Sequence, residues 1–170
     1  MTAPPSSVRL LPVGARDQLQ IRQWLRDPGV QAWWGNAAAA EAEIAIALQS
    51  EAALARMITV DGESIGYAHA LDAASLEPPF PHVIKPGTYD CDLFIGAAPH
   101  RGQGHGQRAL ELLAHEVFAT TLALACSIVV SVRNERAVRA YERAGFIWKS
   151  VWNDPVSGPS WVMLRERPPV

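Results

Sequence analysis

The chain has 170 residues, of which 49% are hydrophobic, and a formal net charge of −2 at pH 7. This length suits one domain with a sizeable core, and no apolar run is long enough to span a bilayer. The charge is negative and the basic residues are not interleaved with exposed aromatic residues, which argues against binding to nucleic acid.

We therefore expect one domain over residues 1–170, with residues 1–7 as a flexible arm and no membrane association. A cytoplasmic location is expected because the chain does not begin with a signal-peptide pattern. Cys91 and Cys126 both lie in apolar runs and are expected to be small buried hydrophobes, with a disulfide as the alternative. The five histidines show no ligand spacing, so no metal is expected. The oligomeric state is expected to be a monomer or a weak homodimer.

The first half of the chain predicts a short strand, helices and a hairpin. Residues 8–13 alternate as a strand, and residues 15–35 form a helix interrupted near Pro28. An alanine-rich helix is predicted over residues 37–55. Two apolar runs within residues 56–71 flank Asp61-Gly62, which is typical of a hairpin turn.

The second half continues with a long loop and alternating strands and helices. Residues 72–88 contain four of the thirteen prolines and predict a loop of a length that is often functional. A strand over 89–99, a glycine loop and a helix to about Ala119 follow, and then a buried strand over 126–132. Asn134 is predicted to cap a helix that Gly145 ends, and two final strands flank the turn at 154–158. Strands interrupted by a few helices indicate an α/β or α+β domain.

The segment HRGQGHGQRALELLAHEVF, residues 100–118, concentrates glycine at the start of a helix. Gly102, Gly104 and Gly106 allow a tight turn and a close approach to a ligand. The first amides of a helix lack partners and carry partial positive charge, so the loop predicts an anion site suited to phosphate. The alternative is an ordinary strand-to-helix turn.

Charge is also segregated along the chain. Residues 61–100 contain six acids and one base, whereas residues 101–150 contain seven bases and four acids. This pattern is consistent with a site that binds an anion in one half and a cation in the other, and alternatively with solvated surface charge.

The glycine loop, RGQGHG, and the later segment VRNERAVRAYERAGF together resemble the two signature motifs of the GNAT N-acetyltransferases. The resemblance implies a mixed, mostly antiparallel central sheet flanked by helices, with splayed central strands that bind acetyl-CoA. The resemblance implies that the loop amides bind the pyrophosphate, with Arg101 as the charged partner. It also implies that the pantetheine arm lies along the main chain of the preceding strand. Gly96 would permit a bulge in that strand. The cofactor-binding residues implied are Phe94, Ile95, Gly96, Ala97, Arg101, Gly102, Gln103, Gly104, His105, Gly106 and Asn134.

Three further segments, VQAWWGN, GESIGYAHAL and YDCDLFIG, resemble the aminoglycoside 6′-N-acetyltransferases, whereas the loop at 72–88 does not match them. In this family Tyr141 stands at the position of the general acid for the leaving thiolate. Asp92 is the candidate base, or else it only positions the amine, and the alternative is an exposed polar strand face. The predicted acceptor-binding residues are Trp33, Trp34, Tyr67, Glu77, Asp90, Asp92 and Asp154.

The predicted function is transfer of an acetyl group from acetyl-CoA to a cationic amine, at the 6′-amine of an aminoglycoside, by direct attack in a ternary complex. The alternatives are acylation of a siderophore hydroxylamine, another small amine or a protein N-terminus. A CoA-binding sensor without turnover is a further alternative of a different class, and the presence of both Asp92 and Tyr141 argues against it.

Overall fold

The computed structural model describes residues 7–170, and the predicted arm at 1–7 lies almost wholly outside them. The first half contains β1 (Val8–Pro12), α1 (Asp17–Leu25), α2 (Pro28–Trp34), α3 (Ala37–Gln49), β2 (Leu54–Val60) and β3 (Glu63–Asp72). The second half contains β4 (Thr88–Ile95), α4 (His105–Thr120), β5 (Ala125–Ser131), α5 (Glu135–Arg143), β6 (Ile147–Asp154) and β7 (Gly158–Glu166). Short 3₁₀ turns follow β3 and β4 at Ala73–Ser75 and Ala98–His100.

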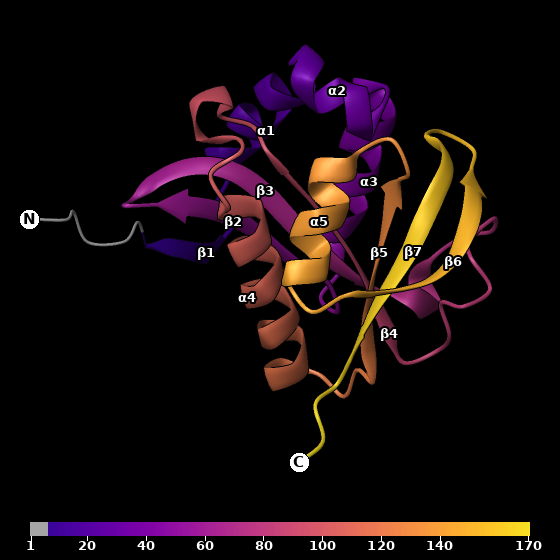
Figure 1. Ribbon diagram of the computed structural model, residues 1–170. Helices are drawn as coiled ribbons and strands as arrows, with labels where there is room; N and C mark the ends of the chain where they lie inside the picture. Colours follow the sequence, from indigo (N-terminus) through magenta and orange to yellow (C-terminus); the bar gives the residue numbers. More distant parts are fainter. Residues whose placement is uncertain (1–6) are drawn as a thin grey trace, which may run out of the picture.

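The strands form one sheet in the order β1-β2-β3-β4-β5-β7-β6 (Figure 1). Every neighbouring pair is antiparallel except β4 and β5, which run parallel. The predicted mixed, mostly antiparallel sheet is therefore confirmed. Within residues 7–170, no helix is long and apolar enough to cross a bilayer.

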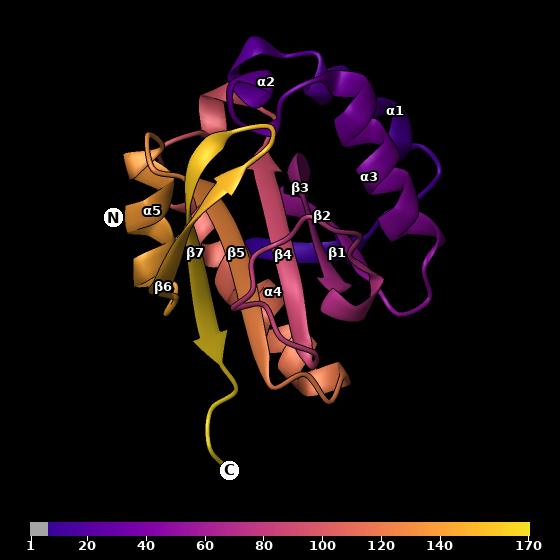
Figure 2. The same ribbon diagram turned by 90° about the vertical axis from the view of Figure 1, so that its right-hand side faces the viewer.

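The parallel pair at the centre of the sheet is short. β4 and β5 are paired only from Thr88 to Cys91 and from Ala125 to Ile128, so their carboxyl-terminal halves are not bonded to each other (Figure 2). Beyond the end of β4, the amides of Gly96 and Ala97 both donate to the carbonyl of Ile65, at 2.8 and 3.0 Å. Two residues opposite one is the pattern of a bulge, as predicted at Gly96. The bulge bends β4 at the point where it leaves the sheet.

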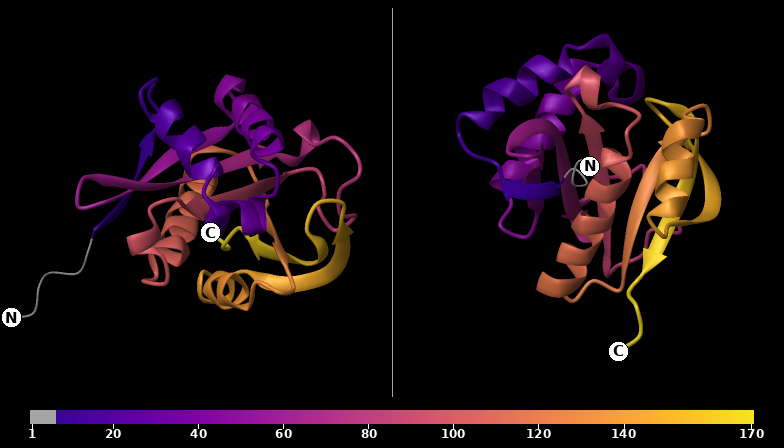
Figure 3. Two further views of the ribbon diagram at one scale, coloured as in Figure 1. Left: turned by 90° about the horizontal axis from the view of Figure 1, so that it is seen from above. Right: turned by 60° about the vertical axis from the view of Figure 1, so that its left-hand side comes forward.

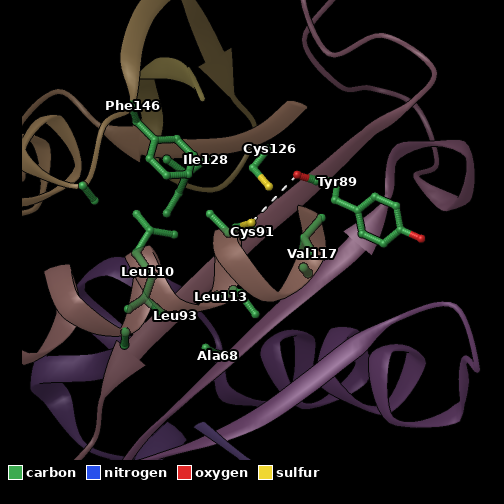
Figure 4. Close-up of a cluster of buried hydrophobic side chains, with 14 of the residues drawn as sticks. Ala68, Tyr89, Cys91, Leu93, Leu110, Leu113, Val117, Cys126, Ile128 and Phe146 are labelled. Atoms are coloured by element: carbon green, nitrogen blue, oxygen red, sulfur yellow. Dashed lines mark hydrogen bonds between the residues drawn. The ribbon is translucent and has the colours of Figure 1, made fainter. Parts of the chain in front are cut away.

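Helices cover both faces of the sheet, with α4 and α5 on one face and α1, α2 and α3 on the other (Figure 3). Successive strand residues point to opposite faces. On β4, Cys91 and Leu93 therefore join the core beneath α4 (Figure 4), whereas Phe94 joins the core beneath α1 to α3. The two cysteines are free and buried. Asp90 and Asp92 share the face of Phe94.

Most predicted elements are present, with two corrections. The strand predicted over residues 89–99 ends at Ile95, and Ala98–His100 form a 3₁₀ turn. The alanine-rich helix ends at Gln49 and not at residue 55, because Leu54 and Ala55 pair with Ala70 and His69 of β3. Sheet pairing overrides the helix propensity of alanine at these positions. The interruption near Pro28 is as expected: Asp27 caps α2 by accepting a hydrogen bond from Gly29 at 2.8 Å.

The close approach of β3 and β4 predicts a large effect at Gly66. A Cβ atom at this position would overlap the carbonyl oxygen of Phe94, which is backbone and cannot rotate away. We expect Gly66→Ala to lower the free energy of unfolding by about 2–3 kcal/mol in urea denaturation. Gly106→Ala is the matched control, because its Cβ would lie 3.8 Å from the nearest side chain in a helix that favours alanine. Equal stability of the two variants would contradict the prediction.

Candidate active site

A cavity of about 390 Å³ opens where β4 and β5 separate. Its walls come from six parts of the fold: α2, the end of β4, the glycine loop, the end of β5, α5 and the β6–β7 turn. The residues that line it include Trp33, Trp34, Asp92, Leu93, Gly102, Gly104, Asn134, Arg136 and Tyr141. The separation of two neighbouring strands thus leaves a hollow that is lined from both faces of the sheet.

The glycine loop forms one end of this cavity. Gly102 and Gly104 have φ values of 71° and 84°, in the left-handed region that favours glycine. Within the described residues, the amides from Gly102 to Gln107 donate to no carbonyl or side chain. Exposed amides at the start of the 16-residue α4 are suited to binding an anion, which is the kind of site that the sequence predicts here.

The predicted cation for this anion site requires correction. Arg101 turns away from the loop, with Nε donating to Ile95 O at 2.8 Å and Nη2 donating to Gly96 O at 3.0 Å. Nη2 also lies 3.2 Å from Asp27, which caps α2. Arg101 therefore links the end of β4 to the start of α2 through these hydrogen bonds and the ion pair. Arg136 lies beside the loop, since a Cβ atom at Gly102 would lie 3.0 Å from its Nη1, and Arg101 and Arg143 also line the cavity.

Arg136 was not predicted, because nothing in the local sequence pattern distinguishes it from the other arginines of its motif. Asn134 lines the cavity and accepts a hydrogen bond from the Ala137 amide at 3.3 Å, which confirms the predicted cap. Arg136 lies two residues later, in the first turn of α5, so its side chain points back toward the loop. Of the other loop residues, Gln103 donates to Pro99 O at 2.6 Å, and His105 is buried beside His100 with ring centroids 5.7 Å apart.

The main chain that faces the gap also differs from the prediction. The polar groups of Gly96 and Ala97 are already bonded to Ile65 and Arg101, and neither residue lines the cavity. Leu93, which was not predicted, lines it with Phe94 and Ile95. The Leu93 amide donates to Asp92 Oδ1 at 2.8 Å, and its carbonyl accepts from Trp34 Nε1 at 3.2 Å. Side chains therefore form the hydrogen bonds with this edge of β4 that β5 does not form.

Asp92 lies at the centre of the cavity wall. Burial raises the pKa of its carboxyl well above the ordinary value, and the nearby charges of Glu43 and Asp90 add to this. Asp90 lies two residues earlier on β4 and accepts a hydrogen bond from Ser127 Oγ at 2.7 Å. Burial raises the pKa of Asp90 to about 6. A carboxylate with a raised pKa is a stronger base than an ordinary one.

Tyr141 faces the cavity from α5. Burial raises the pKa of its hydroxyl, and the charge of Asp92 contributes in the same direction. The hydroxyl is therefore protonated at neutral pH and can act as a hydrogen-bond donor or a general acid. Asp92 and Tyr141 come from opposite faces of the sheet, and both line the cavity where the strands are apart.

One tryptophan of the pair packs in the core and the other is exposed, as expected. Trp34 packs edge-on against Phe94 at a centroid distance of 5.0 Å, whereas the side chain of Trp33 is exposed beside the cavity. Tyr67, in contrast, is fully buried, and its hydroxyl is hydrogen-bonded to His69 Nδ1 at 3.0 Å. Tyr67 does not line the cavity, which corrects its predicted contact with the acceptor.

Two predicted acidic residues also lie away from the cavity wall. Glu77 is exposed in the loop after β3 and does not line the cavity. Asp154 accepts hydrogen bonds from the amides of Val156 and Ser157 at 2.7 and 2.9 Å, so its carboxylate shapes the β6–β7 turn. Ser157 from this turn reaches the cavity, and the charge of Asp154 helps to raise the pKa of Asp92. Within residues 7–170, no three metal-ligating side chains converge.

Comparisons with known proteins agree with this geometry. A family described as "Acetyltransferase (GNAT) domain" matches residues 14–152. The "Aminoglycoside N(6′)-acetyltransferase type 1" proteins of Klebsiella pneumoniae and Serratia marcescens are 27% identical to this chain, over 95% of it and 84% of their own length.

Solved structures of aminoglycoside acetyltransferase AAC(6′)-Ib are similar over nearly the whole chain. The complex with coenzyme A has a TM-score of 0.83 at 26% identity and covers 95% of both chains. The complex with coenzyme A and kanamycin has a TM-score of 0.82 at 25% identity, with the same coverage.

The buried Asp90 predicts an unusual dependence of stability on pH. Its pKa is about 6 in the folded protein against 3.8 ordinarily, so the folded state binds this proton more tightly than the unfolded chain. The contribution of Asp90 to stability is therefore greatest below pH 4 and is lost as the pH rises through about 6. Asp90→Asn should retain the hydrogen bond from Ser127 and remove this loss.

We expect Asp90→Asn to raise the free energy of unfolding above pH 6 by about 1–3 kcal/mol. Urea denaturation of the variant and the wild type from pH 4.5 to 8 checks this. The gain should shrink toward the acid end of the series, and a difference that is independent of pH would argue against burial of the charge as its cause.

Proposed function

The chain belongs to the GNAT acetyltransferase family, and from this premise we propose that it transfers an acetyl group from acetyl-CoA to the 6′-amine of an aminoglycoside. The observation that carries the proposal is that Asp92 and Tyr141 line one cavity in the gap between β4 and β5, beside a loop of unpaired amides. The acceptor class is supported by the two AAC(6′)-Ib complexes and the curated relatives, which match over 95% of the chain.

Binding of acetyl-CoA begins at the glycine loop. The amides from Gly102 to Gln107 receive the pyrophosphate, and Arg136 supplies the positive charge that Arg101 does not. The pantetheine arm then lies beside Leu93 and Ile95, at the edge of β4 that β5 leaves free, and brings the thioester into the gap. The Leu93 amide and carbonyl are already bonded to Asp92 and Trp34, so the arm has to displace these two side chains to pair with Leu93.

The acceptor approaches from the face covered by α1 to α3. An alkyl ammonium has a reference pKa of about 10.4, so the amine arrives protonated and must lose a proton before it attacks. Asp92, with its raised pKa, accepts this proton directly or through water. Trp33 offers an exposed aromatic face to the sugar ring.

Asp92 and Tyr141 are the two side chains that transfer protons in the chemical step. The amine nitrogen forms a bond to the thioester carbon, the carbon–sulfur bond breaks, and the nitrogen releases its second proton to solvent. Tyr141 gives its proton to the departing thiolate and regains one from solvent. Cys91 and Cys126 are at most 1% exposed and lie on the α4 side of the sheet, so direct attack is favoured over an acyl-enzyme.

The catalytic assignment is tested with Asp92→Asn and Tyr141→Phe. Each variant should lower kcat by about 10²- to 10⁴-fold, which is typical of general acid–base catalysis, while the affinity for CoA changes little. Thiol release on a panel of aminoglycosides, polyamines and peptides measures turnover, and calorimetry measures CoA binding. Wild-type turnover on peptides but on no aminoglycoside would reject the proposed acceptor.

The anion loop is tested with a matched pair of glycines. Gly104 and Gly158 both have a positive φ, and at each of them a Cβ atom would have no other atom within 4 Å. Both Gly→Ala changes should therefore cost backbone strain alone, about 1–2 kcal/mol. Only Gly104→Ala should weaken CoA binding, by about tenfold in calorimetry. Equal CoA affinity of the two variants would contradict the role of the loop.

A further inference from the structure

The short helix α2 is joined to β4 at both of its ends. Trp34, at its carboxyl end, donates from Nε1 to Leu93 O at 3.2 Å. Asp27, which caps its amino end, lies 3.2 Å from Nη2 of Arg101. Within residues 7–170, these are the two side-chain hydrogen bonds that join α2 and its cap to the rest of the fold. The position of α2 beside the cavity therefore depends on these polar contacts and on apolar packing.

The contact at the amino end is fixed by the main chain of both elements. On the β4 side, the guanidinium of Arg101 is bonded to the carbonyls of Ile95 and Gly96. On the α2 side, Asp27 accepts a hydrogen bond from the Gly29 amide, and a Cβ atom at Gly29 would overlap Nη1 of Arg101. The hydrogen bond from Gly29 lowers the pKa of Asp27 below its ordinary value of 3.8, and Arg101 contributes in the same direction. The pair is therefore charged at neutral pH.

The contact at the carboxyl end competes with the cofactor. The Leu93 carbonyl lies on the edge of β4 beside which the pantetheine arm binds in the proposed function, and pairing of the arm with Leu93 displaces Trp34. Asp27 and Gly96 do not line the cavity, so their bonds to Arg101 lie outside the path of the arm. The contact between Asp27 and Arg101 is then the polar contact that still joins α2 to β4.

The helix that these contacts hold carries part of the acceptor side. Trp33 lies on α2, is exposed and lines the cavity. The helix has only seven residues, and a helix of this length is not stable by itself in water. If neither end were joined to β4, apolar packing alone would hold it. Contacts with β4 therefore decide whether Trp33 stays at the cavity wall.

We propose that Asp27 is a positioning residue, which through Arg101 keeps α2 at the cavity wall when acetyl-CoA displaces Trp34. The inference rests on the proposed function and deepens it, because it connects the cofactor side of the site with the acceptor side. Asp27 touches neither substrate. Loss of its carboxylate has little effect on α2 in the free protein, where Trp34 still holds the helix, and a large effect in the complex with CoA.

The test compares Asp27→Ser with Asp72→Ser in the full chain, by hydrogen exchange of the α2 amides with and without CoA. Serine caps a helix about as well as aspartate, so Asp27→Ser retains the cap and removes the carboxylate that meets Arg101. Asp72 is the matched control, because it also caps a helical turn by accepting from the amide two residues later, at 3.0 Å. Among the described residues, no arginine or lysine lies within 4.0 Å of Asp72.

The two variants should differ only when CoA is bound. In the complex with CoA, the α2 amides should exchange about tenfold faster in Asp27→Ser than in the wild type, whereas Asp72→Ser should match the wild type. Without CoA, exchange in α2 should be the same for all three proteins. Equal exchange of α2 in the three CoA complexes would overturn the inference. Exchange that is equally fast in Asp27→Ser with and without CoA would also overturn it, because the role would then be structural only.

A conservative variant and a kinetic measurement complete the test. The amide oxygen of Asp27→Asn still reaches both Gly29 and Arg101, so this variant should restore exchange of α2 in the CoA complex to within about threefold of the wild type. With kanamycin as the acceptor, Asp27→Ser should raise KM by about fivefold and leave kcat within about twofold. A fall in kcat without a rise in KM would contradict the positioning role. Wild-type turnover on no aminoglycoside would instead reject the proposed acceptor, on which the exchange experiment does not depend.

Discussion

The rest of the structure depends on the short pairing of β4 with β5. Two parallel strands that remained bonded along their length would close the sheet and leave no cavity. Here the ladder between β4 and β5 stops at Cys91 and Ile128, and a bulge at Gly96 follows the end of β4. The unpaired backbone must be satisfied in another way. Asp92 and Trp34 bond to Leu93, and Arg101 bonds to the carbonyls of the two residues at the end of the strand. Side chains beside the site therefore also hold the strand edge.

The alternation of side chains along β4 explains how one strand serves both a core and a site. Cys91 and Leu93 pack beneath α4 and stabilise the domain, whereas Asp90 and Asp92 point toward the acceptor face. Burial of two carboxylates on a strand costs free energy, and here it raises the pKa of both. The cost is consistent with a functional site, because enzymes commonly trade stability for groups with shifted pKa values.

Arg101 and Arg136 show why the candidate site could be predicted only in part. The sequence places Arg101 at the start of the glycine loop, and proximity along the chain suggested a phosphate partner. In the fold, its guanidinium finds three oxygen acceptors behind the loop, from the end of β4 and the start of α2. Arg136 is far along the chain, and only the packing of α5 beside α4 brings it to Gly102. Tyr67 failed as a prediction for a similar reason, since a polar aromatic residue in a strand can face either the cleft or the core.

The sequence by itself determined the features that depend on local backbone chemistry. Glycines with positive φ before a helix, the Asn134 cap and the Asp61-Gly62 turn are all properties of short segments, and they were predicted at the correct residues. The tertiary structure alone decided which side chains meet. The end of α3 was set by strand pairing, and the role of Arg101 by the carbonyls that surround it. The approach of Glu43 to His69 likewise exists only because α3 lies over β3. Local backbone geometry depends on residues that are neighbours in the sequence, whereas electrostatic partners depend on contacts between residues that are distant in the sequence.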